Sequence, residues 1–244
     1  MLDPLREISG ITFNRGRNDT MYAEQDEEGK VFHFKLGDNR IQATRFWKKG
    51  DFEDISICND FVIMLRSDGV LFTFPLSETT KPDAGLVKSF EGLLPAGEYE
   101  GLASTAGDGK VFVLCKHCEN EKTSREGFGY IFQLNAAGNL IPSGNFEYHV
   151  REIEALAGIK KIHFHPSALT MNPLTHEWYI LSAVNRILVI TNETWKVKAV
   201  YPLNPSIFPQ PEGITFDGQQ NLYISNERNQ SATATILAFA YQEK

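Results

Sequence analysis

The chain has 244 residues, of which 42% are hydrophobic and 23% charged, and its formal net charge is −7. This composition is ordinary for a globular protein, and the length suits one large β domain or two small ones. The acidic balance argues against nucleic-acid binding, which requires a basic face. No apolar run approaches the ~20 residues needed to span a bilayer. The first residues lack the pattern of a signal peptide, and a leader removed upstream stays an open alternative.

A short phrase recurs five times along the chain. Each copy has Glu or Ser, then a small residue or Asp, then Ile or Leu, then a small residue. The copies are Ser9-Gly10-Ile11-Thr12, Glu53-Asp54-Ile55-Ser56, Glu100-Gly101-Leu102-Ala103, Ser167-Ala168-Leu169-Thr170 and Glu212-Gly213-Ile214-Thr215. Their spacings are 44, 47, 67 and 45 residues. A four-stranded propeller blade takes roughly 40–50 residues, so the spacing predicts one blade for each copy.

The first two intervals divide into short strands rich in aromatic and β-branched residues, separated by turns rich in Gly, Asn and Asp. The first interval predicts strands at 20–25, 30–36 and 40–47. The second interval predicts strands at 61–65, 70–76 and 86–90.

The third interval is longer than the others. It predicts strands at 110–115 and 130–134 with a polar loop at 117–129 between them. A short helix is expected near 147–157, since its apolar residues fall roughly on one face and Gly158 can end it. The excess of about 22 residues is too small for a hidden blade.

The last two intervals predict strands at 178–181, 186–191 and 195–201, and then at 221–225 and 233–241. The fifth unit therefore lacks an outer strand. Propellers usually close by borrowing a strand from the opposite terminus. Here the segment 1–6 would have to close the ring, and it is short and contains a proline. Either closure is incomplete or residues upstream of this sequence supply it.

We therefore predict an all-β chain with a single domain over 1–244. The fold is a five-bladed β-propeller whose four-stranded antiparallel blades surround a central channel. The blades cover approximately 8–50, 51–97, 98–162, 163–207 and 208–244. An irregular β-sandwich with chance repeats is the alternative.

The first strand of each blade lines the channel, so the first position of each phrase should face its counterparts. This ring consists of Ser9, Glu53, Glu100, Ser167 and Glu212. Carboxylates held close together raise each other's pKa or require a cation. An oxygen-only ring suits Ca²⁺ better than zinc. The alternative is that these five residues are only a hydrated lining of the channel, without a bound metal ion.

The ends of the second strands predict a second tier at the channel mouth. Its members are Asp26, Arg66, Lys116, Asn226 and Glu227, and His165 lies close to the fourth phrase. A mouth with both acids and bases could hold a metal, an anionic ligand or both, or the bases could simply be ion-pair partners of the acids.

The phrases resemble those of the SdiA-regulated family of bacterial propellers. The matching segments, in order along nearly the whole chain, are Ile8-Ser9-Gly10-Ile11, Phe52-Glu53-Asp54-Ile55, Tyr99-Glu100-Gly101-Leu102, Pro166-Ser167-Ala168-Leu169 and Pro211-Glu212-Gly213-Ile214. The resemblance implies a five-bladed propeller with a calcium site, distantly similar to NHL-repeat proteins. It also implies an exported, often membrane-anchored protein, although a cytoplasmic location stays open. It implies no established biochemical activity.

Three cysteines are too few for a disulfide scaffold. Cys115 and Cys118 form a CxxC that could be a disulfide, a pair of inert thiols, or a redox or metal site. Cys58 lies in an apolar strand and is expected in the core.

Two main functions, and a third, follow from these features. The first is an exported, calcium-binding but non-catalytic propeller, expected to be monomeric, that holds a small molecule or peptide at the channel mouth. The second is a calcium-dependent hydrolase of phosphate esters or lactones. Asp26, Glu227 or His165 could then act as the base, and no spacing selects one of them. The third is a protein-interaction scaffold that uses outer loops such as 117–129.

Overall fold

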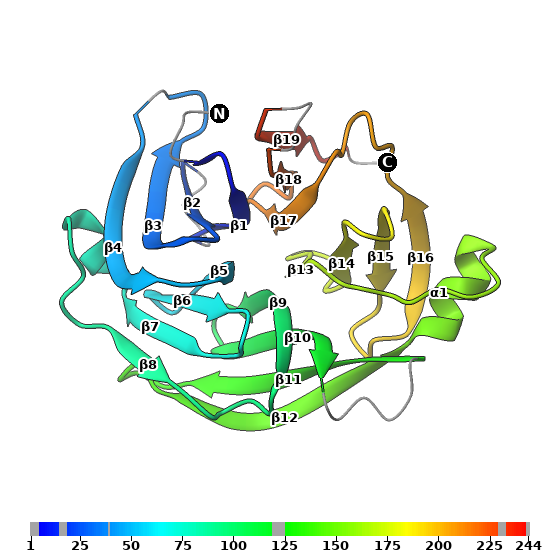
Figure 1. Ribbon diagram of the computed structural model, residues 1–244, viewed down its shortest axis with the longest axis horizontal. Helices are drawn as coiled ribbons and strands as arrows, with labels where there is room; N and C mark the ends of the chain where they lie inside the picture. Colours follow the sequence, from blue (N-terminus) through cyan, green and yellow to red (C-terminus); the bar gives the residue numbers. More distant parts are fainter. Residues whose placement is uncertain (1–4, 15–18, 39, 119–124, 229–232, 243–244) are drawn as a thin grey trace.

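The computed structural model describes residues 5–14, 19–38, 40–118, 125–228 and 233–242. Its strands form five antiparallel sheets, each made from strands that are consecutive in the sequence. Figure 1 looks along the axis of the ring and shows the sheets arranged as the blades of a five-bladed β-propeller. No helix in the described part of the chain has the length and apolar composition of a membrane span.

The first two blades each have four strands in the order of the sequence. They are β1 (Ile8–Phe13), β2 (Thr20–Gln25), β3 (Glu28–Lys35) and β4 (Gln42–Lys49), and then β5 (Phe52–Cys58), β6 (Phe61–Arg66), β7 (Leu71–Pro75) and β8 (Lys88–Phe90). A 3-10 helix at Leu76–Thr80 follows β7.

The third and fourth blades follow the same plan. They are β9 (Gly97–Thr105), β10 (Lys110–Cys118), β11 (Glu126–Leu134) and β12 (Leu140–His149), and then β13 (Ala168–Met171), β14 (Trp178–Ser182), β15 (Ile187–Thr191) and β16 (Val197–Pro202).

The fifth blade has three strands within the described residues. They are β17 (Pro211–Phe216), β18 (Leu222–Asn226) and β19 (Thr235–Phe239). The expected closing segment falls mostly on residues 1–4, which lie outside the described residues. Next to them, the amide of Arg228 donates to the carbonyl of Arg6 at 2.9 Å. Leu5 is fully buried in the core cluster that joins the first and fifth blades.

The hydrophobic core consists of five clusters, and each cluster joins two neighbouring blades. Each repeated phrase supplies its aliphatic residue to a different cluster. These residues are Ile11, Ile55, Leu102, Leu169 and Ile214, in that order from the first blade to the fifth. The repeated Ile or Leu therefore packs a blade against its neighbour, which is why it recurs with the blade period.

The helix begins later than the sequence predicts. Residues 147–149 continue β12 and pair with β11, and α1 runs over Val150–Ala157. Tyr148 stays in the strand because its ring covers Gly127, where even a Cβ atom would lie 1.9 Å from the ring. The helix ends as expected at Gly158, whose φ of 68° is the left-handed conformation that glycine adopts without strain. The expected loop at 117–129 is also shorter, since β10 and β11 extend into it.

Candidate functional site at the channel mouth

β-Bulges place the three ring glutamates. Phe52 pairs with Arg66 and Asp54 with Leu65, so Glu53 is the extra residue on its strand. The same irregularity occurs in β9 between Tyr99 and Gly101, and in β17 between Pro211 and Gly213. Glu100 and Glu212 are the extra residues there. A bulge interrupts the alternation of a strand and re-aims one side chain.

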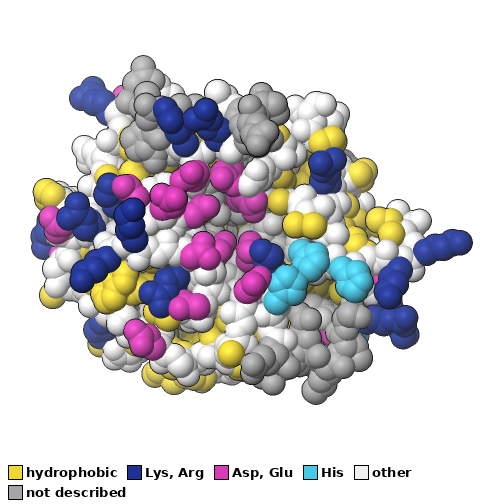
Figure 2. All heavy atoms as spheres, viewed as in Figure 1, with side chains coloured by type: hydrophobic (Ala, Val, Ile, Leu, Met, Phe, Trp, Pro, Cys, Tyr) yellow, Lys and Arg dark blue, Asp and Glu magenta, His cyan; other side chains and the backbone are white. Residues whose placement is uncertain are grey.

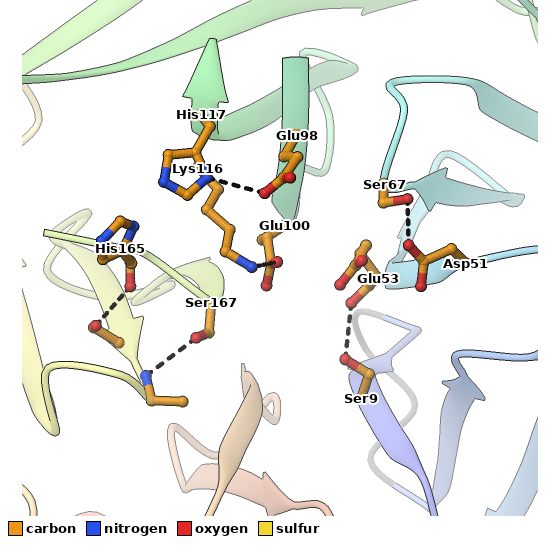
Figure 3. Close-up of polar contacts among 12 residues, drawn as sticks. Ser9, Asp51, Glu53, Ser67, Glu98, Glu100, Lys116, His117, His165 and Ser167 are labelled. Atoms are coloured by element: carbon orange, nitrogen blue, oxygen red, sulfur yellow. Dashed lines mark hydrogen bonds and ion pairs between the residues drawn. The ribbon is translucent and has the colours of Figure 1, made fainter.

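One cavity of about 190 Å³ brings the predicted ring together. All five predicted metal-site residues line it: Ser9, Glu53, Glu100, Ser167 and Glu212. Four of the predicted mouth residues also line it: Asp26, Lys116, His165 and Glu227. Figure 2 shows the acids gathered at the centre of this face with histidines beside them. Figure 3 shows the side chains of Glu53 and Glu100 close together, from the neighbouring strands β5 and β9. Whether these residues bind a metal stays a prediction.

The carboxylates in this cavity are harder to ionise than free ones. Burial, followed by the charges of Glu100 and Asp51, raises the pKa of Glu53 from 4.5 to about 9. Burial and the charges of Glu100 and Glu227 raise the pKa of Glu212 to about 8. Burial and the charge of Glu227 raise the pKa of Asp26 to about 7. Part of the acidic charge is therefore neutralised by protons at neutral pH.

Lys116 supplies the one ammonium group among the residues that line this cavity. Its Nζ donates a hydrogen bond to Oε1 of Glu100, from the neighbouring strand. Burial disfavours the ammonium, but its contact with Glu100 outweighs burial and raises the pKa of Lys116. Burial still raises the pKa of Glu100, although Lys116 opposes that shift.

The two ring serines retain acceptor capacity toward the cavity. Ser9 Oγ donates to the backbone carbonyl of Glu53 at 3.1 Å, which ties the first blade to the second. Ser167 Oγ accepts a hydrogen bond from the amide of Ala183 at 3.1 Å. Each hydroxyl oxygen therefore keeps a lone pair for a further partner.

Arg66 and Asn226 do not line this cavity. Arg66 donates to both oxygens of Asp68 at 2.8 Å, and its guanidinium lies over the ring of Phe72. Asn226 is fully buried. Asn226 lies next to Glu227, which does line the cavity, and successive side chains of a strand point to opposite faces. Only one of two adjacent positions can therefore face the channel.

Two further carboxylates, which the sequence analysis missed, are buried directly behind the ring. Asp54 accepts hydrogen bonds from the amides of Ile55 and Leu102 at 2.8 and 2.7 Å, so it links the second and third blades. Glu24 accepts the amide of Gly10 at 2.6 Å, and its other oxygen has no partner among the described residues. Burial raises the pKa of both carboxyls well above the usual range. The Asp at the second position of the phrase was the available signal, because small residues occupy that position elsewhere.

Cys115 and Cys118 are joined by a disulfide at the end of β10. Cys58 lies outside this disulfide and is buried in the core, as expected. The disulfide encloses Lys116 and His117. The strand pairing is irregular here, since Cys115 faces Tyr99 and His117 faces the adjacent Glu98. The disulfide thus fixes the part of the backbone that presents Lys116 to the cavity.

The oxygen atoms that line this cavity are of the kind that a hard cation prefers, but they do not lie close enough together to coordinate one. Carboxylate and hydroxyl oxygens dominate the cavity, as Ca²⁺ prefers. Within the described residues, no three His, Cys, Asp or Glu side chains are grouped closely enough to hold a metal ion as they stand. Repulsion between the carboxylates and the contact between Lys116 and Glu100 both favour this spread arrangement.

Comparison with known proteins identifies the family and the fold. A family model described as SdiA-regulated matches residues 3–231. No curated protein sequence matches significantly. A luciferin-regenerating enzyme superposes with a TM-score of 0.57 at 7% identity, covering 97% of this chain and 92% of its own. The calcium-binding protein regucalcin from Agrobacterium tumefaciens strain C58 gives 0.55 at 12% identity, covering 94% and 85%. A chain of a nidogen/laminin complex gives 0.57 at 12% identity, covering 91% and 73%. At these identities the similarity shows a shared β-propeller fold.

Proposed function

This chain belongs to the SdiA-regulated family of β-propellers, and on that basis we propose that it binds Ca²⁺ at the acidic channel mouth and holds a ligand there. One observation carries the proposal: three bulged strands direct Glu53, Glu100 and Glu212 into one cavity that Asp26 and Glu227 also line. Burying several carboxylates together is costly unless protons or a cation neutralise them. A divalent cation would remove both the repulsion and the need for protons.

The chemistry of the donors favours calcium over other common ions. Ca²⁺ accepts six to eight oxygen ligands in flexible geometry, whereas Mg²⁺ demands a near-ideal octahedron. A ring of oxygen donors from five separate blades fits the flexible coordination of Ca²⁺ more easily than the strict octahedron of Mg²⁺. Regucalcin is a calcium-binding protein with a similar fold, and this agrees with the proposal.

Thermal unfolding with and without calcium tests the cation site. Millimolar calcium should raise the Tm of the parent protein, because an ion that binds only the folded state stabilises it. The double variant Glu53→Gln with Glu212→Gln should lose this response. Glu147→Gln, on the exposed outer strand β12, should keep it. If millimolar calcium left the Tm of the parent protein unchanged, the proposal would be refuted.

An extracytoplasmic location is part of the same proposal. Disulfides persist mainly in oxidising compartments, and the pair Cys115 and Cys118 is joined in the folded chain. Fractionation of cells that express the natural full-length protein, with detection of the oxidised pair, tests this location. Recovery of the protein from the cytoplasm with both thiols reduced would argue against it.

Hydrolysis of phosphate esters or lactones is the alternative function. The three candidate bases, Asp26, Glu227 and His165, all line the cavity. A metal-dependent hydrolase requires such a base or a metal-bound water beside the ion. Calcium-dependent turnover of a phosphate ester or lactone, lost in the double glutamine variant, would favour catalysis over binding alone.

A further inference from the structure

A second, smaller cavity adjoins the acidic one. It has a volume of about 100 Å³, and it shares Lys116, His165 and Pro166 with the acidic cavity. His117 and His163 complete its basic wall, and Glu126 also lines it. The rings of His117 and His165 lie 4.7 Å apart. Positive or protonatable groups thus gather on the side of the channel away from Glu53, as Figure 3 shows for Lys116, His117 and His165.

His165, which lines both cavities, has unused hydrogen-bonding capacity. Nδ1 of His165 is buried and has no hydrogen-bond partner among the described residues. His117 uses its Nδ1 to contact Glu98 at 2.9 Å. A buried nitrogen without a partner costs free energy, which a bound ligand can recover.

Lys116 belongs to both cavities. Its flexible side chain lies in the wall between them, while its ammonium contacts Glu100 on the acidic side. The ammonium therefore supplies one positive charge at the place where the proposed calcium ion would need a carboxylate. A lysine side chain can redirect its charge by rotation about its four-carbon stem.

We propose that Lys116 is a tethered counter-ion that calcium displaces from Glu100, and that the displaced ammonium, with His163 and His165, then binds an oxyanion group of the ligand. The inference rests on the proposed calcium site and adds the chemical class of the ligand: a phosphate, sulfate or carboxylate. In the cation-free state Glu100 neutralises the positive charge of Lys116, so the histidine cavity attracts an anion only weakly. Once calcium neutralises Glu100, Lys116 and the nearby cation both attract an anion.

This arrangement predicts positive coupling between cation and oxyanion. Coupling is reciprocal, so an oxyanion must tighten calcium binding by the factor by which calcium tightens the oxyanion. We expect a factor of about five or more, within the usual range of such couplings. Calcium affinity can be measured with a competing chelator dye, in chloride alone and with millimolar sulfate or acetate at the same ionic strength. Sulfate represents tetrahedral oxyanions and acetate represents carboxylates.

Variants of the two partners make the test specific. Lys116→Met should bind calcium more tightly than the parent without an oxyanion, by about tenfold, because a nearby positive charge is gone. It should also lose the oxyanion effect. Glu100→Gln frees the ammonium without deleting it, so this variant should bind sulfate in calorimetry even without calcium. Lys198→Met, which removes an exposed lysine paired with Glu177, should behave like the parent.

The outcomes separate this inference from the proposed function. An oxyanion effect in the parent and its loss in Lys116→Met support the inference, and the more effective anion identifies the ligand group. If the parent binds calcium with an affinity that neither oxyanion changes, the inference is overturned, while the proposed calcium site still stands. A parent that binds no calcium refutes the proposed function. In that case, failure of Glu100→Gln to bind sulfate would overturn the anion site independently.

Discussion

Lys116 and Glu100 pair across the antiparallel strands β10 and β9, and their contact lies at the junction of an acidic cavity and a histidine-lined one. Both residues occur where the pairing of the two strands is irregular. The charge state of the channel mouth is therefore linked to backbone geometry that the bulges and the disulfide maintain.

The stability of the cation-free protein should fall as pH rises. The pKa values of Glu53, Glu212 and Asp26 are raised to about 9, 8 and 7, so the folded state holds more protons than the unfolded chain above the usual carboxyl range. Their stabilising contribution is complete below the unfolded pKa values and is lost as pH rises through the folded ones. Each kcal/mol of stability lost in this range should lower the Tm by about 2–4 °C in a chain of this length.

Thermal unfolding from about pH 6 to about pH 9 in a chelating buffer checks this slope. The double variant Glu53→Gln with Glu212→Gln should show a flatter profile, because neither amide titrates. A parent protein that gains stability across this range would contradict the assigned protonation.

Calcium binding should release protons near neutral pH. Glu53 and Glu212 are mostly protonated there, and a carboxyl must lose its proton to coordinate the ion. We expect about one to two protons per ion, and an affinity that increases up to about pH 9. Calorimetry in two buffers with different ionisation enthalpies measures the number released. Glu53→Gln should release fewer, and binding without proton release would place the ion elsewhere.

Removing the disulfide should destabilise the protein moderately. Cys115 and Cys118 close a loop of only four residues, for which the loop-entropy relation gives about 2 kcal/mol. The double serine variant should therefore melt about 4–8 °C lower than the parent. Cys58→Ser, in the core of another blade, is the control for loss of a thiol.

Thiol titration of the unfolded protein checks the pairing itself. One reactive thiol, from Cys58, should appear without reductant, and three should appear after reduction. Three thiols without reductant would show that the pair is reduced in the purified protein.

Gly213→Ala should weaken the junction between the first and fifth blades. An added Cβ atom would lie 2.3 Å from the carbonyl oxygen of Ser9 and 2.4 Å from Oγ of Ser225. These two atoms form a 2.7 Å hydrogen bond between the ends of the chain. We expect a loss of about 1–3 kcal/mol in the free energy of unfolding. Gly85→Ala is a matched control, since its Cβ atom would meet only Glu78, at 3.5 Å. Equal stability of the two variants in denaturant unfolding would contradict this account.

The blade period could be predicted from the sequence because its cause is repeated packing. Ile11, Ile55, Leu102, Leu169 and Ile214 each join one blade to its neighbour, so the same residue type recurs at the same position. The short strands and the end of the helix at Gly158 were predictable for local reasons of turn and cap chemistry. The start of the helix was not, because the contact between Tyr148 and Gly127 depends on a neighbouring strand.

The sequence by itself determined that Ser9, Glu53, Glu100, Ser167 and Glu212 line one end of a common channel, because the repeat assigns them equivalent positions. Only the tertiary structure decided which neighbours join them. Arg66 and Asn226 turn away, and Glu24 and Asp54 lie hidden behind the ring. The physical reason is that the side chains of a strand alternate between its two faces, and that strand pairing and bulges together decide which face turns toward the channel. A bulge is defined by the pairing of two strands, which no single segment encodes.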